Sequence, residues 1–355
     1  WGPGSINTTG IGGSETAVIE IARRFHADGW RVDVFNGAGR YEGVHDGVGY
    51  WDPERWDRAA VDVFVGWRQP AIPAAIRTGR VNLLWLHDLN TGPDEPGHHL
   101  VWDRILGVSA WHAGMLRDYY GLDEDRVSYV PNGIDLSRFD PSVRKKPFQC
   151  VYASSPDRGL LRVLDVWPKI AANEPGARLH VAYGWQGVDA AIARGNTELA
   201  EQKAKIEKLM AADERIVWRG RLPQDELARL YGESVAWLFP SDFLEVSCIS
   251  AMEAMAAGCI PITSTAGALK ETVGNGGILV PGNVYSAAWR DFFTHLTRAV
   301  LAARDVGAPL EAKARMRGAL FSWDVAYRDH WRPLVTQLLR GETTPAHEQR
   351  EAVLV

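Results

Sequence analysis

The sequence predicts an α/β protein with two domains of similar architecture, and three observations lead to this fold class. Short runs rich in β-branched residues alternate with segments of helical periodicity along the chain, as in parallel sheets covered by helices. The length of 355 residues suits two domains. Apolar residues make up 46% and charged residues 23% of the chain, which excludes disorder, collagen and a coiled coil.

The first predicted domain covers residues 1–140. Its expected strands are 31–36, 61–65, 81–87, 104–109 and 127–130, and its expected helices are 14–27, 69–77 and 110–120. Residues 37–43 form a glycine-rich stretch after the strand 31–36, but the following residues 44–50 lack helical periodicity. The strand-turn-helix context of a nicotinamide-cofactor site is therefore missing, and we interpret this region as a flexible loop.

The second predicted domain covers residues 148–320 and follows a proline-containing, basic linker at 131–147. Its expected strands are 148–153, 178–183, 215–218, 235–239, 260–263 and 277–280. A closing segment at 321–340 contains a helix over 323–339 that is expected to pack back on the first domain, and the polar tail 341–355 is expected to be frayed. A glycine turn at residues 10–13 would normally follow a strand, so either that strand is missing or the turn is supported differently.

Charge and cysteine content exclude several classes of partner. Lys and Arg total 39 against 44 Asp and Glu, a net charge of −5, so no basic field attracts nucleic acid. The three cysteines form no C-x-x-C pair, which predicts free thiols, a cytoplasmic location and no structural zinc. No apolar run approaches the roughly 20 residues of a membrane span. Asp123-Glu124-Asp125 precedes a strand and fits helix capping and solvation, so we expect no metal and no cofactor.

Two candidate sites lie in the first domain. Gly12-Gly13-Ser14-Glu15 precede an amphipathic helix, where backbone N–H groups and the helix N-terminus suit an anion. The alternative is a tight turn with Ser14 as N-cap. His87 ends an apolar strand, and ligands gather at the carboxyl ends of parallel strands. The alternative is a histidine that satisfies loop carbonyls.

The strongest signal is the segment 240–258. A helix that begins near Val246 and ends at Gly258 places Glu245 at its mouth and Glu253 about two turns inside, roughly 12 Å along the axis. That separation fits a ligand in which a diphosphate joins a sugar to a ribose. The two carboxylates can accept hydrogen bonds from the hydroxyls of the sugar and of the ribose. The diphosphate would lie at the free N–H groups of the first helical turn. These N–H groups belong to Ser247, Cys248 and Ile249.

At these residues the sequence resembles the retaining glycosyltransferases of family four, which have the GT-B fold. The resemblance rests on the E-x7-E motif of Glu245 and Glu253, on the glycine turn and on residues 129–135. It implies two Rossmann-like domains that face a central cleft. It also implies that Glu253 binds the donor ribose, Glu245 the transferred sugar, and Gly13 the phosphate, with His87 beside the reacting carbon.

Family members carry an Arg and a Lys after the first strand of the second domain. Here Arg158 takes one of these cationic roles, and Arg221 on a neighbouring loop is the candidate for the other. The implied reaction moves a sugar, with hexoses expected, from a nucleotide-diphosphate sugar to an acceptor hydroxyl. The sequence does not identify the acceptor, for which a saccharide or another small molecule is the expectation. Two alternatives stay open, a sugar-nucleotide epimerase of the same fold and a nonenzymatic sugar-nucleotide-binding module.

Overall fold

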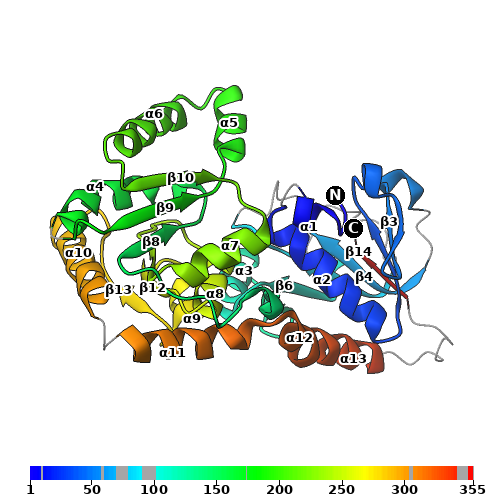
Figure 1. The fold of residues 1–355 in the computed structure, drawn as a ribbon. Coiled ribbons are helices and arrows are strands. Elements are labelled where there is room, and N and C mark those ends of the chain that lie inside the picture. The colour runs from blue at the N-terminus through cyan, green and yellow to red at the C-terminus, as the bar shows by residue number, and fades with distance from the viewer. Residues whose placement is uncertain are drawn as a thin grey trace. The chain divides into compact units, whose positions relative to one another are not determined.

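The computed structural model describes residues 1–8, 11–56, 60–68, 79–89, 101–172, 174–303, 307–341 and 351–354. The chain divides into two compact units, the first of Trp1–Gly133 with Phe321–Val355 and the second of Ile134–Leu320. Each unit contains one largely parallel sheet with helices packed on it, so the predicted α/β class is confirmed (Figure 1). Residues 134–147, expected to be a linker, belong to the second unit. The expected helix at 69–77 lies outside the described residues.

Unit 1 contains a sheet with the strand order β2-β3-β1-β14-β4-β5-β6-β7. The strands are β1 Arg31–Phe35, β2 Gly43–His45, β3 Val48–Trp51, β4 Val61–Trp67, β5 Gly79–Trp85, β6 Arg104–Gly107, β7 Val127–Tyr129 and β14 Glu351–Leu354. The helices are α1 Ser5–Thr8, α2 Gly13–Ala27, α3 Ala110–Tyr120, α12 Trp323–Ala326 and α13 Arg332–Arg340, with a π-helical turn Tyr327–Trp331 between the last two. Helix α2 packs on β1, β3 and β14, and α13 packs on β5.

The prediction of a frayed tail is wrong for residues 351–354. They form β14, which pairs in parallel with β1 on one side and β4 on the other (Figure 1). Ala352 and Leu354 are each only 1% exposed. The strand was not predicted because its apolar run is short and follows the polar residues 341–350. Because α2 packs on β14, the glycine turn is supported by a strand from the other end of the sequence.

The interpretation of residues 44–50 as a flexible loop is also wrong. Strands β2 and β3 form an antiparallel hairpin, and Val48 and Tyr50 are fully buried. The turn residues Asp46 and Gly47 have φ of 52° and 80°, the left-handed conformation that a tight two-residue hairpin requires. Asp-Gly is a strong signal for such a turn, but our sequence argument tested this region only for a strand-turn-helix motif.

Unit 2 contains a fully parallel sheet with the order β10-β9-β8-β11-β12-β13. The strands are β8 Gln149–Tyr152, β9 Arg178–Ala182, β10 Ile216–Gly220, β11 Ala236–Phe239, β12 Ile260–Ser264 and β13 Ile278–Val280. The helices are α4 Leu160–Ala171, α5 Gln186–Ala193, α6 Thr197–Ala211, α7 Gln224–Glu233, α8 Ile249–Ala256, α9 Leu269–Val273, α10 Ala287–Ala302 and α11 Gly307–Gly318. Helices α4, α6 and α10 pack on one side, and α7, α8, α9 and α11 on the other.

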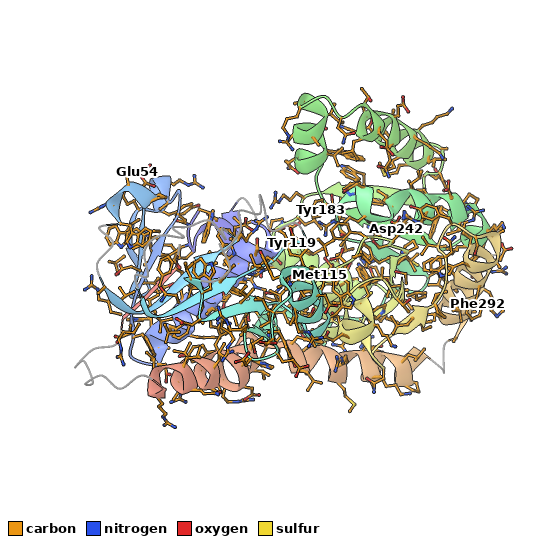
Figure 2. The ribbon with its side chains drawn as sticks, turned by 180° about the vertical axis from the view of Figure 1, so that it is seen from behind. Glu54, Met115, Tyr119, Tyr183, Asp242 and Phe292 are labelled. Carbon is orange, nitrogen blue, oxygen red and sulfur yellow. The ribbon has the colours of Figure 1, made fainter. Side chains whose placement is uncertain are left out.

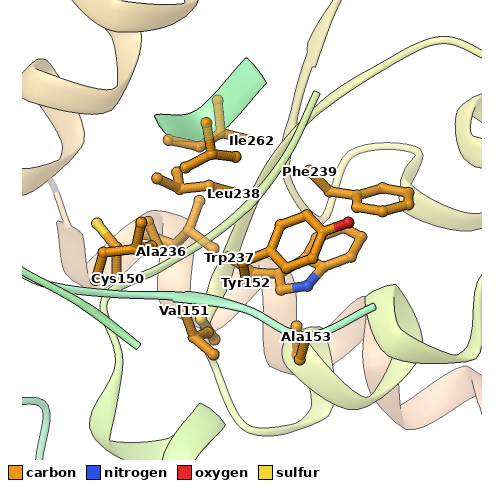
Figure 3. Close-up of a cluster of buried hydrophobic side chains, with 14 of the residues drawn as sticks. Cys150, Val151, Tyr152, Ala153, Ala236, Trp237, Leu238, Phe239 and Ile262 are labelled. Carbon is orange, nitrogen blue, oxygen red and sulfur yellow. The ribbon is translucent and has the colours of Figure 1, made fainter. Parts of the chain in front are cut away.

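The core of unit 2 explains why its central strands are mostly apolar. All residues of β8, β11 and β12 are buried, as expected for parallel strands with helices on both faces (Figure 3). Strand β8 pairs directly with β11. The loops that leave the carboxyl ends of these two strands are therefore neighbours, and they carry Arg158 and Glu245.

Candidate functional site

The centre of the candidate site in unit 2 is an ion pair between Arg158 and Glu245. The Arg158 Nη1 donates to Glu245 Oε1 at 3.2 Å, and the Glu245 side chain is only 8% exposed. Burial raises the pKa of Glu245, and the Arg158 guanidinium opposes this rise. The arginine is half-exposed, so it retains N–H groups that an anionic ligand can reach.

Two glycines allow neighbouring backbone segments to approach closely around the Arg158–Glu245 pair. Gly159 has φ 132°, and a Cβ there would lie 3.0 Å from the carbonyl oxygen of Pro240 on the facing loop. Gly267 has φ 56°, and a Cβ there would lie 2.4 Å from the backbone carbonyl oxygen of Glu245. The next residue, Ala268, donates its N–H to that same oxygen at 2.6 Å. Larger residues at either glycine would displace the loop that presents Glu245.

The loop 241–245 is also fixed by side chains that the sequence analysis did not identify. Asp242, labelled in Figure 2, accepts hydrogen bonds from Arg162 and from the Tyr285 hydroxyl. The Arg158 guanidinium lies over the Phe243 ring, 4.0 Å from its centroid. Two arginines on the β8–α4 segment thus hold consecutive residues of the loop. Arg162 is separated from Arg158 by the spacing of one helical turn, and this spacing was the available signal for it.

Helix α8 begins later than expected. It starts at Ile249 with Cys248 as N-cap, not near Val246, so Glu253 lies about one turn inside the helix. Gly258 has φ 70° and follows the helix end, as predicted. The backbone N–H groups of Ser247, Cys248 and Ile249 have no backbone partner within the described part of the chain. They are available to an anion, together with the buried, unpaired Ser247 hydroxyl.

Glu253 is half-buried, and its carboxylate has no hydrogen-bond partner among the described residues. Burial raises the pKa of Glu253 to about 7, opposed by the Arg138 guanidinium. A carboxylate in this state gains from any ligand hydroxyl that donates to it. Arg221 is exposed at the end of the edge strand β10, two strands away from β8, and makes no ion pair within the described residues.

The glycine turn in unit 1 is described from Ile11 onwards. Gly12 is the extended N-cap of α2, and Gly13 is the first helical residue. Ser14 does not cap the helix; its hydroxyl donates to Glu15 Oε2 at 3.0 Å. The alternative of a Ser14 cap is therefore wrong.

His87 lies two residues beyond the end of β5, with its ring 4.5 Å from that of Trp85. Its Nε2 is buried and has no partner within the described residues. Burial lowers the pKa of His87, and His112 and Arg68 lower it further, so the ring is neutral. His112 itself accepts from the Val108 N–H at Nδ1, which makes Nε2 the donor to the Asp88 carbonyl at 3.2 Å. Sequence reasoning missed His112, which lies within the helix 110–120.

Two aromatic side chains of unit 1, those of Tyr50 and Trp56, pack against other residues of the same unit. Tyr50 is fully buried, and Trp56 stacks on Phe64 with an interplanar angle of 10°.

Among the described residues, no group of three or more His, Cys, Asp or Glu side chains is placed to hold a metal ion. Within the same residues, no helix is long and apolar enough to span a membrane.

Comparison with known proteins shows which proteins this chain resembles. Residues 136–294 match the model of the family described as "Glycosyl transferases group 1". D-inositol 3-phosphate glycosyltransferases of Mycobacterium bovis and Mycobacterium tuberculosis are 26% identical over 317 residues, which cover 84% of this chain. The chain spans 62% of the length of these relatives.

Solved structures agree on the fold. A glycosyltransferase from Rickettsia africae has a TM-score of 0.71 at 16% identity, with 93% of this chain and 96% of that chain covered. HepE from Anabaena in complex with UDP and glucose has a TM-score of 0.66 at 15% identity, with 92% and 96% covered. The resemblance drawn from the sequence is confirmed, and the fold is GT-B.

Proposed function

We propose, on the premise that residues 136–294 belong to the group 1 glycosyl transferases, that the protein transfers a hexose from a nucleotide-diphosphate sugar to an acceptor hydroxyl. The anomeric configuration is retained, and no metal ion takes part. The acceptor is a saccharide or another small molecule. The observation that carries the proposal is the Arg158–Glu245 pair beside the unpaired N–H groups that precede α8.

These residues suit the chemistry of the donor. The bond between the anomeric carbon and the diphosphate oxygen breaks with its electron pair on that oxygen, while the acceptor oxygen bonds to the carbon. The acceptor proton passes to the leaving phosphate. Negative charge therefore grows on the diphosphate, where Arg158 and the N–H groups of Cys248 and Ile249 can stabilise it. Cationic and N–H donors replace a divalent metal in this role.

The two carboxylates suit the two ends of the donor. Glu245 is buried and oriented by Arg158, so it can accept hydrogen bonds from the transferred sugar. Glu253 has an unpaired carboxylate and can accept from the ribose. Gly13 would bring a further N–H to the phosphate, His87 is neutral and would lie beside the reacting carbon, and Arg221 is proposed as a second cation. HepE, a protein of similar fold, has been solved with UDP and glucose.

A panel of nucleotide sugars tests the proposal. Thermal-shift measurement first identifies a donor that stabilises the protein, since a ligand that binds only the native state raises the melting temperature. The same donor is then incubated with saccharide acceptors, and the nucleoside diphosphate and the products are quantified. We expect a new glycoside with the donor's anomeric configuration. Free or epimerised sugar without transfer would favour the epimerase, and binding without turnover would favour a binding module.

The proposed location is the cytoplasm. All three cysteines, Cys150, Cys248 and Cys259, are unpaired and buried, which supports a reducing compartment. Detection of the protein in a cell fraction that lacks membranes and secreted material would test this location.

A further inference from the structure

Arg68 stands out in unit 1 because its backbone is in an unfavourable conformation. It has φ 59°, in the left-handed region, and the other non-glycine residues with positive φ in the described part of the chain are Asp46 and Phe148. Asp46 is in the tight β2–β3 turn, and aspartate tolerates this conformation. A long side chain does not, so the surrounding structure must stabilise Arg68 in it.

The backbone of Arg68 is fixed at the carboxyl end of the central strands. Its N–H donates to the carbonyl of Trp85, the last residue of β5, at 2.9 Å. This bond continues the β4–β5 pairing one residue beyond the end of β4. The Arg68 side chain therefore starts at the carboxyl end of the central strands. The two candidate loops of unit 1, the glycine turn and the His87 loop, lie at this end.

The guanidinium of Arg68 connects these two loops. It contacts both carboxylate oxygens of Asp88, with Nε 2.5 Å from Oδ2 and Nη2 3.0 Å from Oδ1. Its Nη1 lies 3.5 Å from the Ser14 hydroxyl and 3.8 Å from Glu15 Oε1. Asp88 follows His87, whereas Ser14 and Glu15 follow the turn glycines. The carbonyl of Asp88 also accepts from His112, so this residue is held at both its side chain and its backbone.

We propose that Arg68 is a positioning residue, which fixes the glycine turn and the His87 loop relative to one another. This inference rests on the proposed function, because it assigns the two loops to the same donor site. The Arg68 guanidinium already pairs with two carboxylates, those of Asp88 and Glu15, so it acts through these loops and does not serve as a phosphate ligand. A planar fork with several N–H groups can reach Asp88 and Ser14 together, which a lysine ammonium cannot.

The backbone conformation provides a sharp test with the variant Arg68→Gly. Glycine adopts positive φ readily, so this change removes the side chain and relieves the backbone at the same time. We expect kcat/KM for the donor to fall at least tenfold, mainly through kcat, while the melting temperature does not fall. Arg68→Lys should recover part of the loss because it keeps the positive charge. Asp46→Gly is the matched control, and its kcat/KM should stay within twofold of the wild type.

Hydrogen exchange gives a readout that does not depend on the activity. Amides in residues 11–20 and 86–89 should exchange faster in Arg68→Gly and not in Asp46→Gly. Arg68→Asn, which also tolerates the left-handed region, replaces the glycine variant if the latter does not fold. Unchanged kcat/KM together with unchanged exchange would overturn the role of Arg68. A wild-type protein that turns over no nucleotide sugar would contradict the proposed function alone, because the exchange comparison would still test Arg68.

Discussion

Glu253→Gln should stabilise the protein at neutral and alkaline pH while it weakens donor binding. In the native state, burial raises the pKa of Glu253 from its ordinary 4.5 to about 7. The native protein therefore binds this proton more tightly than the unfolded chain does. The resulting stabilisation is complete below pH 4.5 and is lost as the pH rises through 7. Above that pH the wild type contains an ionised, half-buried carboxylate, whereas glutamine stays neutral and keeps nearly the same shape.

The size of the effect follows from the change in pKa. At about 1.4 kcal/mol for each pH unit, a rise from 4.5 to about 7 corresponds to about 3 kcal/mol. Partial exposure of the side chain makes this an upper value. Urea unfolding followed by tryptophan fluorescence, at pH 5 and at pH 8, measures the difference between the two proteins. We expect the variant to be clearly more stable at pH 8 and to differ much less from the wild type at pH 5, where the native Glu253 carboxyl is still protonated.

A matched variant and a binding measurement complete this test. Glu201 is exposed on α6, so Glu201→Gln should leave the free energy of unfolding unchanged at both pH values. Calorimetry with the nucleoside diphosphate of the accepted donor should show weaker binding to Glu253→Gln, because an amide oxygen accepts ribose hydroxyls less well than a carboxylate. A variant that is less stable than the wild type at pH 8 would refute the reasoning on burial. Unchanged affinity would remove Glu253 from the donor site.

Four further results are expected. Arg158→Ala should lower kcat/KM by about 100-fold, the usual cost of one lost donor to a developing anion; an effect under twofold would contradict its role. Phe243→Leu removes the ring under that guanidinium and should raise the KM for the donor by several-fold, with recovery in Phe243→Tyr; equal KM values would show that the ring does not orient Arg158. Turnover should persist in EDTA, and a loss reversed by Mg²⁺ or Mn²⁺ would establish a metal requirement. Leu354→Asp places a charge at a side chain that is 1% exposed and should abolish cooperative folding of unit 1, whereas a native circular dichroism spectrum would argue against β14.

Much of the fold could be predicted because the strands of both sheets are short, apolar and separated by helical periods. Strands β11 and β12 are buried on both faces, and this environment favours mostly apolar residues in the sequence. The element β14 could not be predicted in this way, since its pairing depends on residues from the opposite end of the sequence. The β2–β3 hairpin was predictable from its Asp-Gly turn, but the sequence argument considered only a strand-turn-helix motif in this region.

Some residues of the candidate site could be predicted from local sequence patterns, and others could not. Glu245 and Glu253 were visible because two acids interrupt an apolar segment at a spacing that suits one ligand. Arg68, His112 and Asp242 were not, because each acts through a partner on another loop. No local pattern in the sequence reports a hydrogen bond between the loops of different strands. The start of α8 at Ile249 was likewise not predictable from helical propensity alone.

The position of β14 has a consequence for how unit 1 folds. Its pairs, such as Ala352 with Val32 and Val63, join residues from opposite ends of the sequence with all of unit 2 between them. Contacts of such high sequence separation form slowly, because the entropy of closing a long loop is lost before they form. Until β14 is in place, β1 and β4 present unpaired edges in the middle of the sheet. A strand from another chain can pair with such an edge, so refolding at high protein concentration should favour association between partly folded molecules.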